Sequence, residues 1–109
     1  MKPFSLLAFA MAAGLGFVSC ASTQSNGRPA AQAGSEVSAG RSLFLKNCAH
    51  CHGADATGDE GPDLHNLDWR DEQIAVRIRT GKKGQMTAFA EKLSVREVSE
   101  VIAYLRTLK

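Results

Sequence analysis

Two cysteines and two histidines lie within five positions of each other in this 109-residue chain, in the run Cys48-Ala49-His50-Cys51-His52. The Cys-x-x-Cys-His spacing is the attachment pattern of c-type haem. Two thiols three positions apart can add across the two vinyl groups of one porphyrin edge, and the imidazole that follows then reaches the iron. We therefore predict one haem c, attached covalently through Cys48 and Cys51, with His52 as an axial ligand of the iron.

Two other chemistries use cysteine pairs with this spacing. A thioredoxin-like redox pair requires a βαβ setting and a larger domain. A structural zinc site usually takes ligands from a second, distant pair, and of the three histidines only His65 lies outside the motif. Haem attachment is therefore the preferred interpretation, with His50 as an exposed spacer between the cysteines.

The first 19 residues predict an export signal and not part of the fold. Lys2 is followed by an apolar stretch over residues 4–18, which is shorter than the about 20 residues needed to span a bilayer. The sequence Phe-Val-Ser-Cys at residues 17–20 resembles a bacterial lipobox, which would make Cys20 a lipidated N-terminus. Cleavage after Ala21 would instead remove Cys20. We expect an exported, periplasmic-side protein, with a lipid anchor in a membrane as the favoured form.

Residues 20–37 are rich in Ser, Thr, Gln, Asn, Gly and Ala without an apolar period, which predicts a flexible linker. Residues 38–109 form the single predicted domain. A domain of this size is marginal for a core of side chains alone, so a buried porphyrin would supply the missing apolar mass. Without haem the domain is expected to be poorly folded.

Three main helices are predicted and strand signals are weak, so the predicted fold class is all-α. The first helix covers residues 38–48 and the second residues 71–80, where Gly81 is a natural residue to end it. The third begins at a capping box formed by Ser94 and Glu97. Its apolar stripe consists of Val98, Val101, Ile102 and Leu105.

The iron needs a sixth ligand or remains open on one side. Met86 is the only methionine outside the predicted leader, and a lone methionine is more often core packing than a ligand. Its position in a loop, with Gly81 and Gly84 nearby, favours the ligand role, and histidine–methionine ligation is typical of electron transfer. The rival is His65, which we expect to be an exposed residue of a polar loop.

Three further residues are candidates for the haem site, either beside the His52 ligand or at the haem propionates. The carbonyl of Pro62 is a candidate acceptor for the second ring nitrogen of His52, a bond that would fix the tautomer of the ligand. Trp69 and Arg70 are candidates to bind or neutralise the haem propionates. Trp69 is equally compatible with ordinary core packing.

Four motifs together resemble the small class I bacterial cytochromes c. They are residues 48–52, Gly-Pro-Asp-Leu at 61–64, Gly-Gln-Met-Thr-Ala-Phe at 84–89 and Val-Ile-Ala-Tyr-Leu-Arg at 101–106. The resemblance covers residues 38–109 and implies a compact helical fold around one covalent haem. It implies that the first and last helices cross, so that Gly40 and Phe44 meet Tyr104 or Leu105. It also implies His52 and Met86 as axial ligands, although Thr87 stands where the family commonly has proline.

The number and placement of charged residues indicate which kinds of binding partner are expected. A formal net charge of +2 gives no basis for nucleic-acid binding. Lys82 and Lys83 end a short basic stretch that follows an acidic one over residues 55–72. Such clusters are often only solvated faces. The functional interpretation is that Lys82 and Lys83 dock an acidic redox partner.

The expected function is that of a monohaem electron carrier and not of an enzyme. It would pass single electrons between respiratory or dehydrogenase partners outside the cytoplasm, as a monomeric domain held near a membrane. One alternative is a haem protein with a labile sixth ligand that binds small ligands or reduces peroxide. Another is a cytochrome subunit of a larger oxidoreductase.

Overall fold

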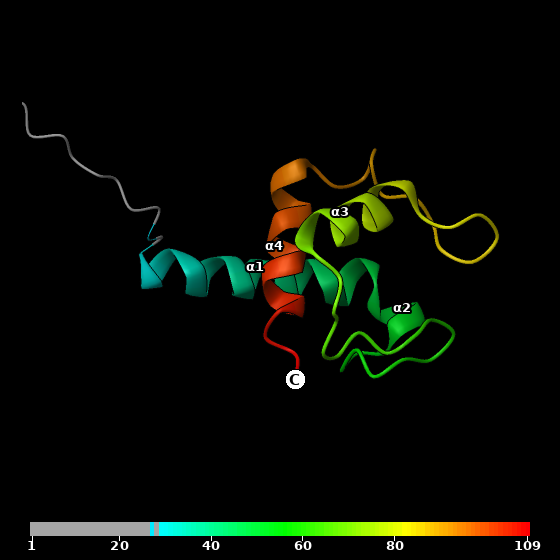
Figure 1. The fold of residues 1–109 in the computed structure, drawn as a ribbon, viewed down its shortest axis with the longest axis horizontal. Coiled ribbons are helices and arrows are strands. Elements are labelled where there is room, and N and C mark those ends of the chain that lie inside the picture. Colours follow the sequence, from blue (N-terminus) through cyan, green and yellow to red (C-terminus); the bar gives the residue numbers. More distant parts are fainter. Residues whose placement is uncertain (1–26, 28) are drawn as a thin grey trace, which may run out of the picture.

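Four helices make up the regular structure of the part of the chain that the computed structural model describes, Gly27 and residues 29–109. They are α1 (Ala30–Asn47), α2 (Ala49–His52), α3 (Asp71–Thr80) and α4 (Val95–Leu105) (Figure 1). No strand occurs among these residues, and none of their helices is long and apolar enough to cross a membrane. The predicted all-α fold with three main helices is confirmed. The predicted signal and Cys20 lie outside the described residues.

The first helix is longer than the sequence pattern indicated. It begins at Ala30, eight residues before the predicted start at Ser38, so the linker conformation predicted for residues 30–37 is wrong. Alanine, glutamine and glutamate favour a helix even where no face is buried. Residues 30–35 are all exposed, and this end of α1 projects beyond the other three helices (Figure 1). An apolar period could not have revealed it, because the segment packs against little.

The helices α1 and α4 cross at Gly40, and this contact organises the domain (Figure 1). A Cβ atom at Gly40 would lie 1.8 Å from the backbone oxygen of Glu100, so no other residue fits without moving α4. One turn further along α1, the Phe44 ring packs on the Tyr104 ring with their centroids 5.4 Å apart. The family resemblance implied that Gly40 and Phe44 contact Tyr104 where α1 and α4 cross, and the structure confirms these contacts.

Replacing Gly40 by alanine is expected to destabilise the haem-loaded protein by about 1–3 kcal/mol, because α1 and α4 must separate to admit the methyl group. The matched control is Gly34→Ala in the same helix, where an added Cβ meets nothing within 4 Å. That change is expected to be neutral or to stabilise by up to about 1 kcal/mol. Guanidinium unfolding of both variants measures the difference, and equal midpoints would contradict the assigned crossing.

The predicted capping box sets the start of α4. The Glu97 backbone N–H donates to Ser94 Oγ at 3.2 Å, and the Ser94 backbone N–H donates to Glu97 Oε2 at 2.8 Å. The second bond, together with the Ser94 hydroxyl, lowers the pKa of the Glu97 carboxyl. Because the folded-state pKa is depressed, the stabilisation is present above the ordinary value of 4.5 and is lost as the pH falls below it.

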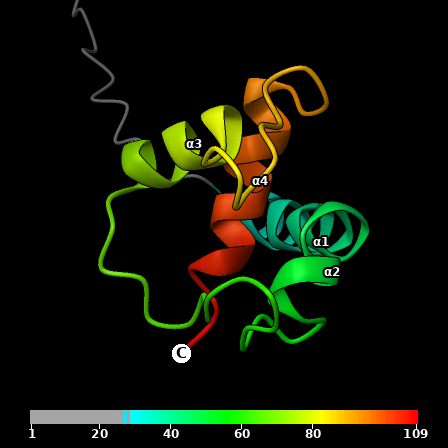
Figure 2. The same cartoon turned by 90° about the vertical axis from the view of Figure 1, so that its right-hand side faces the viewer.

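The core lies where α1, α3 and α4 meet. Ile74 and Ile78 contribute the inner face of α3, at the i, i+4 spacing that the sequence showed, and the apolar stripe of α4 packs beside them. The α3 helix ends at Gly81 with φ +64, a conformation that favours glycine. Residues 53–70 are different, because they contain no helix and only Ala56 among them is buried. They form the long loop seen below α3 in Figure 2.

Candidate haem-binding site

The cysteine motif lies at the bend where α1 passes into α2. Cys48 ends α1, its backbone N–H donating to the Phe44 carbonyl at 2.8 Å, and α2 is a single turn. The His52 backbone N–H donates to the Cys48 carbonyl at 3.0 Å. Positions three and four apart lie on one side of a helical turn, so Cys48, Cys51 and His52 share a face. Sequence analysis predicted no separate helix here.

Both cysteines of the motif are free thiols and are half-buried. Burial, and to a smaller extent the neighbouring Cys51, raise the pKa of the Cys48 thiol to about 11. The Cys48 side chain is therefore a neutral thiol at physiological pH. A thiol that adds to a vinyl group contributes both its sulfur and its hydrogen, so two free thiols on one helical face fit haem attachment.

His52 is the one buried polar side chain in the described part of the chain. Its Nδ1 lies 2.8 Å from the carbonyl oxygen of Pro62, the contact suggested by the sequence. A carbonyl oxygen only accepts, so Nδ1 carries a proton, and in the neutral imidazole the lone pair is then on Nε2. An imidazole oriented in this way is a ready metal ligand.

Gly61 allows the loop to close over the His52 ring, a role that sequence analysis did not assign. A Cβ atom at Gly61 would lie 2.8 Å from Cε1 and 2.9 Å from Nδ1 of His52. The Gly61 backbone N–H also donates to the Cys51 carbonyl at 2.6 Å. The segment 61–62 is thus fixed to the motif at both residues. The position of Gly61 in the Gly-Pro-Asp-Leu motif was the sequence signal that could have revealed this role.

Met86 lies in a tight backbone turn that folds back on α3. Lys82 and Met86 exchange two backbone hydrogen bonds, each of 2.8 Å. A Cβ atom at Gly81 would lie 2.4 Å from the Met86 carbonyl oxygen, so glycine is needed beneath the turn. The Phe89 backbone N–H then donates to the Ile78 carbonyl at 3.0 Å. Met86 is partly buried against the core, held by bonds that do not depend on a proline at position 87.

The rival ligand, His65, is engaged within its own loop. Its Nδ1 lies 2.6 Å from Oδ1 of Asp63, and its backbone N–H donates to the same oxygen at 2.8 Å. These bonds lower the pKa of the Asp63 carboxyl. The prediction that His65 is exposed is wrong, since its side chain is only 23% exposed. His50, by contrast, is exposed as predicted.

Trp69 and Arg70 lie at the start of α3. Trp69 is 45% exposed, so its interpretation as a core residue is wrong. It lines an open cavity of about 440 Å³ along α3, together with Glu72, Gln73, Val76, Arg77 and Thr80. Arg70 is exposed, and its backbone N–H donates to Gln73 Oε1 at 2.9 Å.

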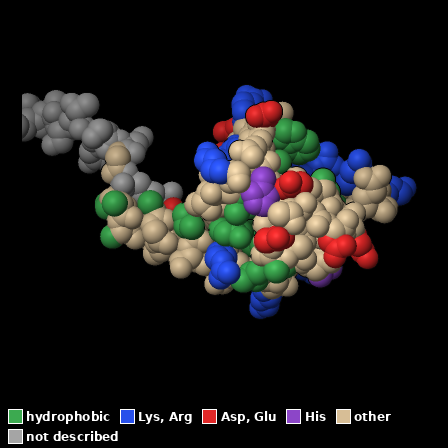
Figure 3. Space-filling model, turned by 90° about the horizontal axis from the view of Figure 1, so that it is seen from below, with side chains coloured by type: hydrophobic (Ala, Val, Ile, Leu, Met, Phe, Trp, Pro, Cys, Tyr) green, Lys and Arg blue, Asp and Glu red, His purple; other side chains and the backbone are tan. Residues whose placement is uncertain are grey.

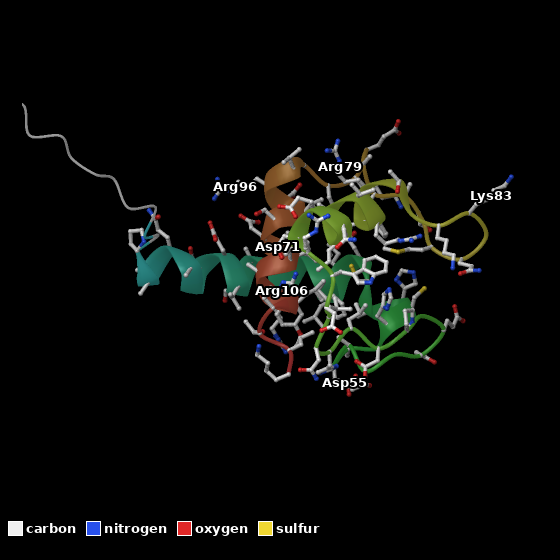
Figure 4. All side chains as sticks on the ribbon, viewed as in Figure 1. Asp55, Asp71, Arg79, Lys83, Arg96 and Arg106 are labelled. Carbon is white, nitrogen blue, oxygen red and sulfur yellow. The ribbon has the colours of Figure 1, made fainter. Side chains whose placement is uncertain are left out.

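Arg106 fixes the chain that leads into α3, another role that sequence analysis missed. Its Nε donates to Asp71 Oδ1 at 2.8 Å and its Nη1 to the Leu67 carbonyl at 2.7 Å. Its Nη2 donates to the Trp69 carbonyl. Figure 4 shows Arg106 and Asp71 close together beside α4. These partners are more than 30 positions away in sequence, so no local pattern connects them.

Two free thiols and a buried imidazole on one helical turn, in a domain of three crossing helices, define a monohaem cytochrome c domain. Residues 35–105 match the family described as cytochrome c oxidase, cbb3-type, subunit III. The chain belongs to this family. Membership implies a covalent haem c and a protein of a typically exported class.

Two relatives and one solved structure illustrate the similarity. The chain is 39% identical over 75 residues to the cbb3-type cytochrome c oxidase subunit CcoP of Rubrivivax gelatinosus, covering 63% of this chain and 25% of that protein. It is 35% identical over 71 residues to a cytochrome c-553-like protein of Synechocystis, and the match covers 63% of this chain and 66% of that protein. The crystal structure of cytochrome cL from Methylophaga aminisulfidivorans superimposes with a TM-score of 0.62 at 28% identity. The match covers 67% of this chain and 53% of that structure. The chain thus spans about a quarter of the length of the oxidase subunit.

Proposed function

We propose that this protein is a monohaem electron carrier that works outside the cytoplasm. Cys48 and Cys51 would hold the haem covalently, and His52 and Met86 would be the protein ligands of its iron. The observation that carries the proposal is the bond from His52 Nδ1 to the Pro62 carbonyl, because it leaves Nε2 free to bind iron. The haem supplies one-electron redox chemistry, and the protein sets its potential and access.

The protein residues would supply both ligands of the iron. Gly61 and Pro62 hold the His52 ring in one orientation, and the Lys82–Met86 turn holds the methionine. With both ligands bound, the iron would change little in geometry between its two oxidation states and would offer no place for a substrate. Fast outer-sphere transfer through an exposed haem edge is the function that such a site performs best.

Carbon monoxide binding to the reduced native protein tests this proposal against the ligand-binding alternative. A carrier with Met86 on the iron is expected to leave the reduced spectrum unchanged under carbon monoxide. A stoichiometric spectral change in the native protein would show a labile sixth position. It would favour a protein that binds small ligands or reduces peroxide.

The exposed pair Lys82 and Lys83 is proposed as the docking site for an acidic redox partner. Both residues lie in the turn that carries Met86, and Figure 4 shows Lys83 pointing into solvent at its tip. Acidic side chains gather over another part of the same end of the molecule (Figure 3). A lysine pair so close to the methionine ligand would bring an anionic acceptor near the haem edge.

We expect Lys82→Glu/Lys83→Glu to slow oxidation of the ferrous protein by ferricyanide, an anionic acceptor, by about tenfold at low salt, with the difference shrinking as salt rises. Stopped-flow absorbance measures the rates. The matched control is Arg41→Glu/Lys109→Glu, which changes the net charge equally at two exposed residues outside the turn. Equal slowing in both variants would show that the rate depends only on net charge, which would contradict docking at Lys82 and Lys83.

We further propose that Cys20 carries the lipid that holds the domain at the periplasmic side of a membrane. The support is the lipobox-like run before Cys20 together with the typically exported character of the family. In fractionated cells the protein should pellet with membranes, and Cys20→Ala should release it. Membrane association that persists in Cys20→Ala would refute the lipid anchor.

A second candidate function is that of a cytochrome subunit within an oxidase. It is favoured by the family match and by the likeness to CcoP over this domain. A permanent subunit would copurify with a larger haem-containing complex at constant stoichiometry from native membranes. A carrier would be recovered alone.

A further inference from the structure

The turn that carries Met86 begins directly at the end of α3, and Gly81 is the residue that joins them. Its backbone N–H donates to the Arg77 carbonyl at 2.8 Å, which ends the helix. Its φ of +64 and ψ of −161 lie in a region that essentially only glycine adopts. Gly81 is buried, whereas residues 82–85 are exposed in the turn that extends past α3 (Figure 1). The turn is therefore connected to the helix through one buried glycine.

The segment that follows Met86 returns along the C-terminal end of α3 and is bonded to it. The Phe89 backbone N–H donates to the Ile78 carbonyl at 3.0 Å. The Ala90 backbone N–H donates to the Arg79 carbonyl at 3.1 Å. The last carbonyls of a helix have no partner within it, so these bonds satisfy two of them. Together with the bonds inside the turn, they tie the methionine to α3 through the backbone alone.

Gly81 and this returning segment are in direct backbone contact. A Cβ atom at Gly81 would lie 2.4 Å from the Met86 carbonyl oxygen, 2.7 Å from the Ala88 nitrogen and 2.8 Å from the Thr87 carbonyl carbon. All three are backbone atoms, which cannot rotate aside as a flexible side chain can. To reach an ordinary contact of 3.4 Å the two backbones would have to separate by about 1 Å. A side chain at position 81 would therefore move the Met86 backbone relative to α3.

We propose that Gly81 is a positioning residue that keeps Met86 on the iron, and that a side chain at position 81 would open the iron to small ligands. This inference rests on the proposed role of Met86 as the sixth ligand. Distances between metals and their ligands hold to within about 0.2 Å, so a backbone shift of about 1 Å is enough to weaken the bond. The fraction of open iron then rises, and an external ligand gains apparent affinity in proportion.

Imidazole binding to the ferric protein tests this inference, because imidazole competes with Met86 for the iron. In Gly81→Ala the apparent affinity for imidazole should rise about ten- to a hundredfold over that of the native protein. The far-red iron–methionine band should weaken in the same variant. Met86→Ala has no methionine to displace and sets the upper limit of the rise. Optical titration measures both changes, and a Gly81→Ala protein with native affinity and a native band would overturn the proposal.

The matched control is Gly84→Ala in the same turn. Gly84 also has a positive φ, +72, but an added Cβ would meet nothing within 4 Å. Both substitutions place alanine where φ is positive, and only Gly81→Ala also pushes against the Met86 backbone. Gly84→Ala should change the imidazole affinity by no more than about twofold. A rise in Gly84→Ala as large as that in Gly81→Ala would overturn the assignment to Gly81.

Hydrogen exchange in the native protein tests the same contact without any variant. The backbone N–H groups of Met86 and Phe89 are hydrogen-bonded, whereas that of Gly84 has no partner in the described part of the chain. After correction for intrinsic rates, the two bonded groups should exchange about tenfold or more slowly than Gly84. Equal exchange would show that the turn is not held against α3, and it would overturn the inference even where Gly81→Ala does not fold.

The native protein and its variants together separate this inference from the proposed function. If the native protein shows the far-red band and Gly81→Ala binds imidazole no better than Gly84→Ala, only the role of Gly81 is refuted. If the native protein lacks the band and binds imidazole as tightly as Met86→Ala, Met86 ligation itself is refuted, and the proposed function with it.

Discussion

The protein with Met86 replaced by alanine is expected to keep its covalent haem but to lose the weak far-red charge-transfer band of iron–methionine ligation. Its reduction potential should fall by on the order of 0.1–0.3 V, part of the roughly 0.8 V range that axial ligands span. The reason is that a thioether stabilises reduced iron, and alanine supplies no ligand. The reduced variant should also bind carbon monoxide. Optical spectroscopy and redox titration measure the three changes.

The control for this variant is Gln85→Ala, which changes an exposed side chain in the same turn and leaves the Lys82–Met86 backbone bonds in place. It is expected to retain the far-red band and the potential. A Met86→Ala protein that keeps the band would show that another residue is the sixth ligand. His65 would then be the first to test, although its ring is bonded to Asp63.

The double variant Cys48→Ala/Cys51→Ala is expected to lose both its haem and its cooperative fold. Residues 53–70 bury only Ala56 among the described side chains, so they have little apolar surface to hold them in place without the porphyrin. A domain of this size has little stability to spare. Haem staining of a denaturing gel measures attachment, and thermal unfolding followed by circular dichroism measures the fold.

Cys20→Ala is the matched control for the double variant, since it removes a cysteine outside the motif and should retain the haem stain and the unfolding transition. Helix content alone is not a sufficient readout, because α1 and α4 can form locally. A cooperative, native-like transition in the double variant would contradict the view that haem completes the core. Haem that remains attached through a denaturing gel would contradict attachment at Cys48 and Cys51.

Local signals in the sequence were enough to predict much of the fold. The capping box at Ser94 and Glu97 and the acidic start of α3 lie next to the residues they organise, so they can be recognised without the tertiary structure. The motif at Cys48 and the contact of His52 with Pro62 also lie within a short stretch of chain. The spacing of these residues in sequence restricts their spacing in the fold.

The features that were missed depend on long-range packing or on its absence. Arg106 contacts residues more than 30 positions away, and the exposure of Trp69 became known only from the structure. The start of α1 at Ala30 depends on helix propensity in a segment that buries nothing, where an apolar period gives no signal. The partial burial of His65 follows from its bonds to Asp63 in a loop that sequence composition alone describes as polar.

The most direct test of the central claim is an optical spectrum of the ferric protein, produced with the c-type haem maturation system and exported. We predict a c-type haem spectrum that includes the weak far-red band of iron–methionine ligation. Such a spectrum would support His52 and Met86 as the axial ligands and with them the electron-carrier function. A covalent haem without that band would contradict Met86 ligation and favour His65 or an open iron, and hence ligand binding or catalysis.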